Sequence, residues 1–172
     1  MPFANAARSL ARRPLVAALA LAAAFVPLAA SATRAGDAPP AFSLPRLDGH
    51  GVVDLAKLRG KPVYLNFFAS WCGPCNDEAA GVGTLYTRYH GKGLVTLGID
   101  DAEVPSKGLA FAKQYRWAFA TIADGSGEVT RTYSNGIGLP VHVFIDRRGT
   151  ISTYRVGEMA PSEIDAAIKK IL

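Results

Sequence analysis

A buried-type strand that runs directly into a cysteine pair constrains this chain most. Residues 62–69 read PVYLNFFA, a dense run of β-branched and aromatic residues of the kind that is buried on both faces of a sheet. A stretch of helical character follows to about Tyr89, and a second such strand, LVTLGI, occupies residues 94–99. Two strands joined by a helix-length connection predict a parallel β-α-β unit with a right-handed crossover. The chain is therefore expected to form an α/β fold.

The other segments extend this unit. Apolar segments on both sides of Asp48 and Gly49 predict an N-terminal β-hairpin, and strands expected at 141–145 and 150–156 flank a second turn signal, DRRG. Helices are expected at residues 106–115 and 128–134. Four apolar residues at helical spacing predict a closing helix: Ile164, Ile168, Ile171 and Leu172. The expected order is hairpin, β, α, β, α, α, β, β, α.

The first 32 residues have the layout of an export leader. Three arginines precede an uncharged, Ala-rich run from residue 14 to residue 32, which ends in Ala-Ser-Ala. A cleaved signal peptide and a retained inner-membrane anchor formed by residues 14–32 both fit this pattern. In either case the arginines favour export of the remaining chain to the periplasm or another extracytoplasmic compartment.

Behind the leader, residues 33–40 (TRAGDAPP) are small, polar and Pro-rich, which predicts a linker. Residues 41–172 are then expected to form one monomeric domain of ordinary size. Removing residues 1–32 takes away three of the 19 basic residues and leaves 16 against 14 acidic ones. A domain so close to neutral gives no electrostatic reason to expect nucleic acid as a partner.

Both cysteines of the chain, Cys72 and Cys75, lie three apart at the strand–helix junction. As a structural disulfide, so short a loop would stabilise the fold by only roughly 2 kcal/mol, against nearly 5 kcal/mol for a loop spanning a domain. A structural zinc site needs four ligands, and the three histidines are scattered. Covalent haem attachment needs a histidine directly after the second cysteine, where Asn76 stands. A redox-active pair is the interpretation that accounts for the spacing.

The position of the pair predicts a role for each sulfur. Cys72 would begin the helix, where unpaired N–H groups and the positive end of the dipole favour the thiolate, so it is the expected attacking sulfur. Cys75, one turn later and more buried, is the expected resolving sulfur. Gly73 lets a partner's backbone come close, and Pro74 fits the first helical turn.

The sequence around the pair resembles the TlpA/ResA-like thiol:disulfide oxidoreductases of the thioredoxin superfamily. The resemblance covers about residues 41–172 and rests on LRGKPVYLNFFASWCGPCNDE, GIGLPVHVFIDRRGTI and the segment 42–55. It implies a thioredoxin fold, with a mixed central sheet flanked by helices and an N-terminal β-hairpin extension. It also implies an enzyme that works by dithiol/disulfide exchange without a cofactor or a bound metal.

The same resemblance assigns further site residues. Pro140 matches the cis-proline that packs beside the cysteine pair, and Glu78 matches an acidic residue near the disulfide. Asn66 holds the place where cytosolic thioredoxins carry a buried acid. Four residues are expected to contact the client protein: Trp71, Gly73, Pro74 and Leu139.

The sequence also departs from the family pattern. Gly81 and Gly83 follow Ala80, which stands where relatives tend to have proline, so the helix is expected to be irregular there because each glycine costs roughly 1 kcal/mol relative to alanine. His142 replaces a small hydroxyl residue, and strand alternation predicts that it is half exposed, opposite Val141.

The aromatic residues Trp117 and Phe119 are expected to lie in the core and not on a docking surface.

The expected function is an exported reductant of client-protein disulfides, recharged by a membrane thiol donor. Gly-Pro between the cysteines resembles the reducing thioredoxins. By resemblance, the clients would be apocytochromes c or a copper-site protein of a terminal oxidase. The alternative is a copper-binding metallochaperone that uses Cys72, Cys75 and His142. Its weakness is the spacing, because related copper carriers resemble Cys-X-X-X-Cys.

Overall fold

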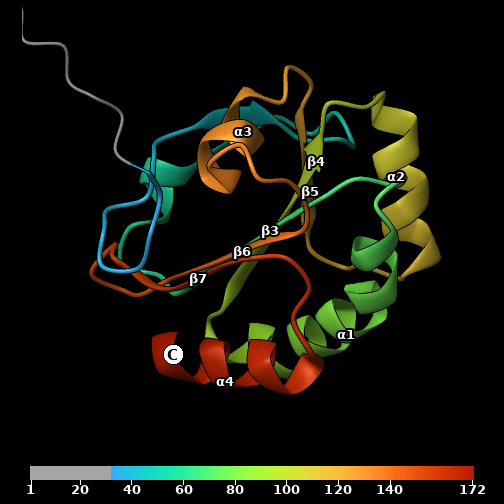
Figure 1. The fold of residues 1–172 in the computed structure, drawn as a ribbon. Helices are drawn as coiled ribbons and strands as arrows, with labels where there is room; N and C mark the ends of the chain where they lie inside the picture. The colour runs from blue at the N-terminus through green and yellow to red at the C-terminus, as the bar shows by residue number, and fades with distance from the viewer. Residues whose placement is uncertain (1–31) are drawn as a thin grey trace, which may run out of the picture. The chain divides into compact units, whose positions relative to one another are not determined.

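The central sheet of the computed structural model has five strands in the order β5-β4-β3-β6-β7 (Figure 1). The structure describes residues 32–172. The strands are β3 (Val63–Phe68), β4 (Val95–Asp101), β5 (Ala120–Asp124), β6 (Val141–Ile145) and β7 (Ile151–Val156). β4 runs parallel to β3 and to β5, whereas β6 runs antiparallel to β3 and to β7. This arrangement confirms the β-α-β unit and the mixed sheet.

β5 is the strand that the sequence pattern did not predict. Its five residues, ATIAD, include only two β-branched side chains, so the local signal is weak. The strand lies at the edge of the sheet and pairs in parallel with β4, from Leu97↔Ala120 to Asp101↔Asp124. Pairing with a neighbour far away in sequence, more than local propensity, therefore determines this strand.

Helices cover both faces of the sheet. They are α1 (Gly73–Tyr89), α2 (Pro105–Gln114), α3 (Glu128–Ser134) and α4 (Pro161–Ile171), with two short 3-10 helices, η1 (Leu55–Leu58) and η2 (His90–Lys92). Buried side chains of α1, α2 and α4 form one hydrophobic cluster, which includes Trp117 and Phe119 as expected. A second cluster on the other face receives Tyr133 of α3 and Phe42 beside the N-terminal hairpin, β1 (Ser43–Pro45) and β2 (Val52–Asp54). Figure 1 shows α1 and α4 side by side below the sheet and α3 above it.

The alternation of β3 decides which side chains meet the active-site helix. Tyr64 and Phe68 point into the cluster that α1 and α4 cover, whereas Leu65 and Phe67 point into the opposite one. Asn66 shares the face of Tyr64 and is directly paired with His142 of β6. The sheet therefore presents polar side chains from two strands beneath α1.

The two glycines inside α1 do not make it irregular, contrary to expectation: the helix is continuous from Gly73 to Tyr89. A Cβ at Gly81 would lie 3.1 Å from Cγ of Pro161, and a Cβ at Gly83 would lie 3.2 Å from Cδ1 of Trp117. Both are tight contacts, so the glycines allow α4 and the Trp117 ring to pack closely on the helix. Trp117 also donates through Nε1 to the carbonyl of Ala79 at 2.8 Å. Tertiary packing thus outweighs the low helix propensity of glycine.

The segment 33–40 contains no helix or strand, and its first residues lie on the domain. The Thr33 amide donates to Oδ1 of Asn135 at 2.8 Å, and Nδ2 of Asn135 donates to the Thr33 carbonyl at 3.0 Å. Gly36 donates to the carbonyl of Ile151 at 2.8 Å. The leader expected at residues 1–32 lies, except for its last residue, outside the described part. Within residues 32–172, no helix is both long and apolar enough to cross a membrane.

Candidate active site

A disulfide joins Cys72 and Cys75 at the start of α1. Cys72 is the N-cap of the helix, and its Sγ accepts a hydrogen bond of 3.2 Å from the Cys75 amide. The Cα atoms of the two residues are 5.2 Å apart, within the range that a disulfide spans. The attacking position predicted for Cys72 therefore coincides with the helix end whose free N–H groups stabilise a thiolate.

The backbone around the pair is held by side chains from other elements. Asn76 donates through Nδ2 to the carbonyls of Ser70 and Cys72, at 3.1 and 2.8 Å. Tyr115, just after α2, donates its hydroxyl to Oδ1 of Asn76 at 2.9 Å. These bonds tie the turn before the helix to its first turn. The sulfur of Cys72 is thereby kept in one position relative to the helix end.

An acid that follows β4 by two residues, Glu103, braces the same turn. Glu103 accepts from the Ser70 amide at 2.8 Å and from the Ser70 hydroxyl at 2.7 Å. Burial alone would raise the pKa of Glu103, but hydrogen bonds from Asp100 and Ser70 outweigh it and lower the pKa. Asp100 is fully buried, and burial together with the adjacent Glu103 raises its pKa to about 8. At neutral pH the raised pKa favours the protonated form of Asp100, beside Glu103, whose lowered pKa favours the ionised form.

A surface groove runs along the exposed side of the pair. Its walls are formed by residues of the active-site turn, of α3 and of the loop before β6: Trp71, Cys72, Gly73, Pro74, Asp101, Gly127, Thr130, Arg131, Ser134, Gly136, Gly138 and Leu139. All four expected client-contact residues line it. Trp71 and Ile137 are large apolar side chains with 67% and 74% of their surface exposed near this groove. Cys72 is part of the lining, whereas Cys75 is not.

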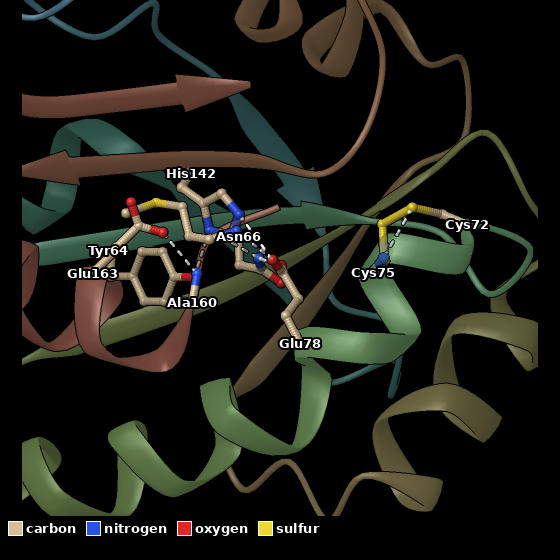
Figure 2. A network of polar contacts seen from close by, with 9 residues as sticks. Tyr64, Asn66, Cys72, Cys75, Glu78, His142, Ala160 and Glu163 are labelled. Carbon is tan, nitrogen blue, oxygen red and sulfur yellow. Dashed lines mark hydrogen bonds and ion pairs between the residues drawn. A yellow bond between two sulfur atoms is a disulfide. The ribbon is translucent and has the colours of Figure 1, made fainter. Parts of the chain in front are cut away.

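Glu78 lies one helical turn after Cys75 and is buried, with 4% of its surface exposed. Its Oε1 accepts from Nδ2 of Asn66 at 3.1 Å, and its Oε2 accepts from the amide of Met159 at 3.2 Å. Nε2 of His142 lies 3.1 Å from Oε2. Figure 2 shows the carboxylate turned toward Asn66 and His142, on the sheet side of α1. The sequence placed Glu78 near the pair; the structure adds the group of donors around it.

The predicted half-exposed position of His142 is wrong, because the side chain has no accessible surface. Alternation does turn it away from Val141, but α1 and the segment around Met159 cover this face of β6 as well. Nδ1 of His142 lies 2.9 Å from the Tyr64 hydroxyl. The ring is therefore engaged beneath α1, and within residues 32–172 no three acidic, histidine or cysteine side chains cluster as a metal site would require. The ligand set of the copper alternative is not assembled.

The Leu139–Pro140 peptide bond is cis, as expected. Pro140 itself is buried, and its carbonyl accepts from the Gly157 amide at 2.8 Å. Leu139, and not Pro140, lines the groove. Among the described residues, the backbone groups of Leu139 have no hydrogen-bond partner in the protein.

Sequence reasoning missed five residues around the site: Tyr64, Ser70, Asp100, Glu103 and Met159. Tyr64 and Asp100 are hidden in strands that read as uniformly buried, and Met159 contributes only a backbone amide. Glu103 follows β4 by two residues, at the carboxyl edge where ligands and functional groups collect in parallel sheets. That placement was the one signal that could have indicated it.

Known proteins resemble the chain over most of its length. Residues 35–154 match the AhpC/TSA family. The thiol-disulfide oxidoreductase ResA of Bacillus thuringiensis subsp. konkukian is 33% identical over 136 residues, which cover 79% of this chain and 78% of that protein.

Two solved structures from Mycobacterium tuberculosis share the fold. DsbF matches with a TM-score of 0.71 and 26% identity over 80% of this chain and 99% of its own. A secreted disulfide oxidoreductase homologous to Escherichia coli DsbE matches with a TM-score of 0.67 and 26% identity, over 75% and 95% of the two chains.

Fold, cysteine pair and relatives agree. A disulfide at the N-terminus of the helix that follows the central strand β3, within a mixed five-stranded sheet, is the arrangement of a thioredoxin-like redox site. The chain belongs to the AhpC/TSA family and is a thiol:disulfide oxidoreductase of the ResA-like group, with a thioredoxin fold and an N-terminal hairpin extension.

Proposed function

We propose that the protein is exported and reduces disulfides of client proteins, with Cys72 as the attacking sulfur and Cys75 as the resolving sulfur. The observation that carries this assignment is the asymmetry of the pair: Cys72 lines the groove at the helix end, whereas Cys75 lies behind it. A client disulfide entering the groove therefore meets Cys72 first.

The exchange consists of two displacements. The Cys72 thiolate attacks one client sulfur, so that a mixed disulfide forms and the other client sulfur leaves as a thiolate. Cys75 then loses its proton and attacks Sγ of Cys72, which releases the second client thiolate and forms the Cys72–Cys75 disulfide. Two electrons pass to the client, and two protons end on its thiols.

Glu78 is proposed to act on these ionisations. It follows Cys75 by three residues, so the two side chains lie on neighbouring positions of one helix face. A carboxylate there disfavours a second negative charge and offers a place for the proton of the resolving thiol. Glu78→Gln should lower the ionisation midpoint of the thiols, as measured by their ultraviolet absorbance during a pH titration.

The groove is proposed to bind an extended client segment. Leu139 offers unpaired backbone groups at its edge, which suits strand-like pairing that tolerates many sequences. Trp71 supplies an exposed apolar surface, and Gly73 and Pro74 leave the approach to Cys72 open. The buried Pro140 is proposed to support Leu139 in the lining of the groove.

The wider assignment combines the leader pattern with the family. A reductant in an oxidising compartment must be recharged, so a membrane thiol donor is proposed as the electron source. Clients would be apocytochromes c or the copper-site protein of a terminal oxidase. The protein is proposed to act in the periplasm or a similar compartment, free or held by residues 14–32.

Trapping in the native cell tests the client and the direction together. Cys75→Ser should accumulate mixed disulfides through Cys72, which a gel without reductant displays and mass spectrometry identifies. Cys72→Ser is the matched control and should trap none. A midpoint potential near that of reducing thioredoxins, about −270 mV, is expected, and a value above about −180 mV would contradict the reducing role.

A further inference from the structure

His142 is a buried histidine that the exchange reaction described above does not use. It pairs across the sheet with Asn66 and lies between Tyr64 and Glu78, beneath the first turns of α1 (Figure 2). Burying an imidazole without accessible surface is costly unless its two nitrogens have partners. The neighbours of each nitrogen therefore indicate which form of the ring the site accepts.

The neighbours of Nδ1 both carry hydrogens. The Tyr64 hydroxyl lies at 2.9 Å and Nδ2 of Asn66 at 3.5 Å. The Asn66 amide is oriented by its bond to Glu78, which requires Nδ2 and not the oxygen on that side. Burial and the charge of Glu78 raise the pKa of Tyr64 well above its ordinary value, so its hydroxyl keeps the proton. The hydroxyl could donate or accept, but Nδ2 of Asn66 can only donate, so Nδ1 is assigned as the acceptor and the single proton of a neutral ring then lies on Nε2.

The neighbour of Nε2 is the carboxylate. Nε2 lies 3.1 Å from Oε2 of Glu78, although the contact lacks the direction of a regular hydrogen bond, so its attraction is mainly electrostatic. With Asn66 on Oε1 and the Met159 amide on Oε2, Glu78 has three N–H groups around two oxygens. Together these contacts fix the orientation of the carboxyl group.

We propose that His142 is a positioning residue for thiol–disulfide exchange: its Nε2–H, assigned to that nitrogen by the neighbours of Nδ1, holds the Glu78 carboxyl group in the network beneath α1 and so fixes its position relative to the cysteine pair. This inference rests on the proposed role of Glu78. It gives a use to the histidine that stands where a small hydroxyl residue was expected.

Other charged groups near the ring have partners of their own. Arg155 of β7 is the cross-strand partner of His142 on the side away from Asn66, and it pairs with Glu163 of α4 at 3.3 Å. Glu163 also accepts from the Ala160 amide at 2.9 Å. Tyr64 from β3 and Glu78 from α1 are the titratable groups in direct contact with the ring.

A thiol titration of the reduced full-length protein tests the proposal. Glu78→Gln and His142→Phe should each lower the ionisation midpoint of the cysteines by about half a pH unit or more, because each removes the charge of Glu78 or its support. The double variant should show the shift of one change only, since both act through the same carboxylate. His142→Gln, which restores an uncharged N–H near the position of Nε2, should return the midpoint toward that of the parent.

The outcomes separate the two roles. If Glu78→Gln leaves the titration unchanged, the role of Glu78 is wrong and this inference falls with it. If Glu78→Gln shifts the midpoint and His142→Phe does not, or if the shifts of the two variants add, the inference about His142 alone is overturned.

A spectroscopic signature does not depend on the stability of the phenylalanine variant. Nitrogen-15 chemical shifts of the His142 ring should report the Nε2–H tautomer in the parent protein at neutral pH. Tyr64→Phe removes the donor to Nδ1 and should reduce the preference for that tautomer. A ring that carries its proton on Nδ1 in the parent would overturn the proposal.

Discussion

Two buried acidic sites flank the cysteine pair, and they solve the cost of burial in opposite ways. Glu78, on the side of β6, is contacted by the N–H groups of Asn66, Met159 and His142. Asp100, at the end of β4, has no hydrogen-bond donor within reach of either oxygen among the described residues. Its nearest ionisable partner is another acid, Glu103. The same functional group thus meets several N–H groups on one side of the active-site turn and no hydrogen-bond partner on the other.

The difference follows from what each element can offer. The site of Glu78 lies where a helix crosses two strands, so side-chain amide, ring and backbone donors converge on it. Asp100 is packed against α2 at Gly108, where a Cβ would overlap the carboxylate. The packed carboxyl group has no hydrogen-bond partner there, and its burial favours the protonated form. The partners of a buried acid are therefore decided by the elements that the fold brings together, and not by the residue type.

The largest expected effect comes from removing the acceptor on the Glu78 side. Glu78→Met should lower the free energy of unfolding by about 2–4 kcal/mol, because it leaves the N–H groups of Asn66 and Met159 buried without an acceptor and removes the contact with His142. Urea denaturation at pH 7 measures it. The same substitution at Glu128, an exposed residue, should change stability by less than about 0.5 kcal/mol. Equal effects at the two positions would show that the donors around Glu78 contribute nothing specific.

Substitution of Asp100 by asparagine should instead raise the free energy of unfolding, by an amount that depends on pH. In the folded protein the pKa of Asp100 is about 8, above its ordinary 3.8, so the folded state binds more protons between these values. Its contribution to stability is therefore complete below about pH 4 and is lost as pH rises toward 8. Asp100→Asn mimics the protonated form because its side chain is uncharged at every pH.

The measurement is a comparison of unfolding free energies at pH 5 and pH 8. At pH 5 the Asp100→Asn variant and the parent should differ little, and at pH 8 the variant should be more stable by about 1–3 kcal/mol. A parent and a variant with the same pH slope would mean that Asp100 is already ionised at neutral pH. The contrast between the two acidic sites would then disappear.

The smallest effect concerns the link between the acid pair and the active-site turn. Ser70→Ala removes the hydroxyl donor to Glu103 but keeps the backbone amide bond, so the expected loss is about 1 kcal/mol at pH 7. The pKa of Glu103 is lowered in the folded protein, so this contribution is present above its ordinary value of 4.5 and fades as pH falls below it. Thermal unfolding at pH 7 and pH 4 measures the difference. A loss of the same size at both values would assign the effect to packing.

Much of the fold could be predicted because strong local patterns carry it. The parallel pair β3 and β4, the helix after the cysteines and the β6–β7 hairpin follow from runs of apolar residues and from turn signals. β5 was not predicted because its five residues have a weak strand propensity, and its pairing with β4 stabilises it instead. The predicted irregularity of α1 was wrong for the same reason, because its glycines allow the close packing of Pro161 and Trp117, which are distant in sequence.

The sequence by itself determined the chemistry of the site: two cysteines three apart, a glycine and a proline between them, and a helix beginning at Cys72 are local features of one segment. Only the tertiary structure decided their surroundings. Asn66, Glu78 and His142 belong to three elements, and the register Asn66↔His142 is set by strand pairing across 76 positions of sequence. Alternation along β6 predicted which face His142 takes but not that α1 would cover it. Burial, and with it the charge of each acid, depends on contacts between distant segments, so no local pattern could contain it.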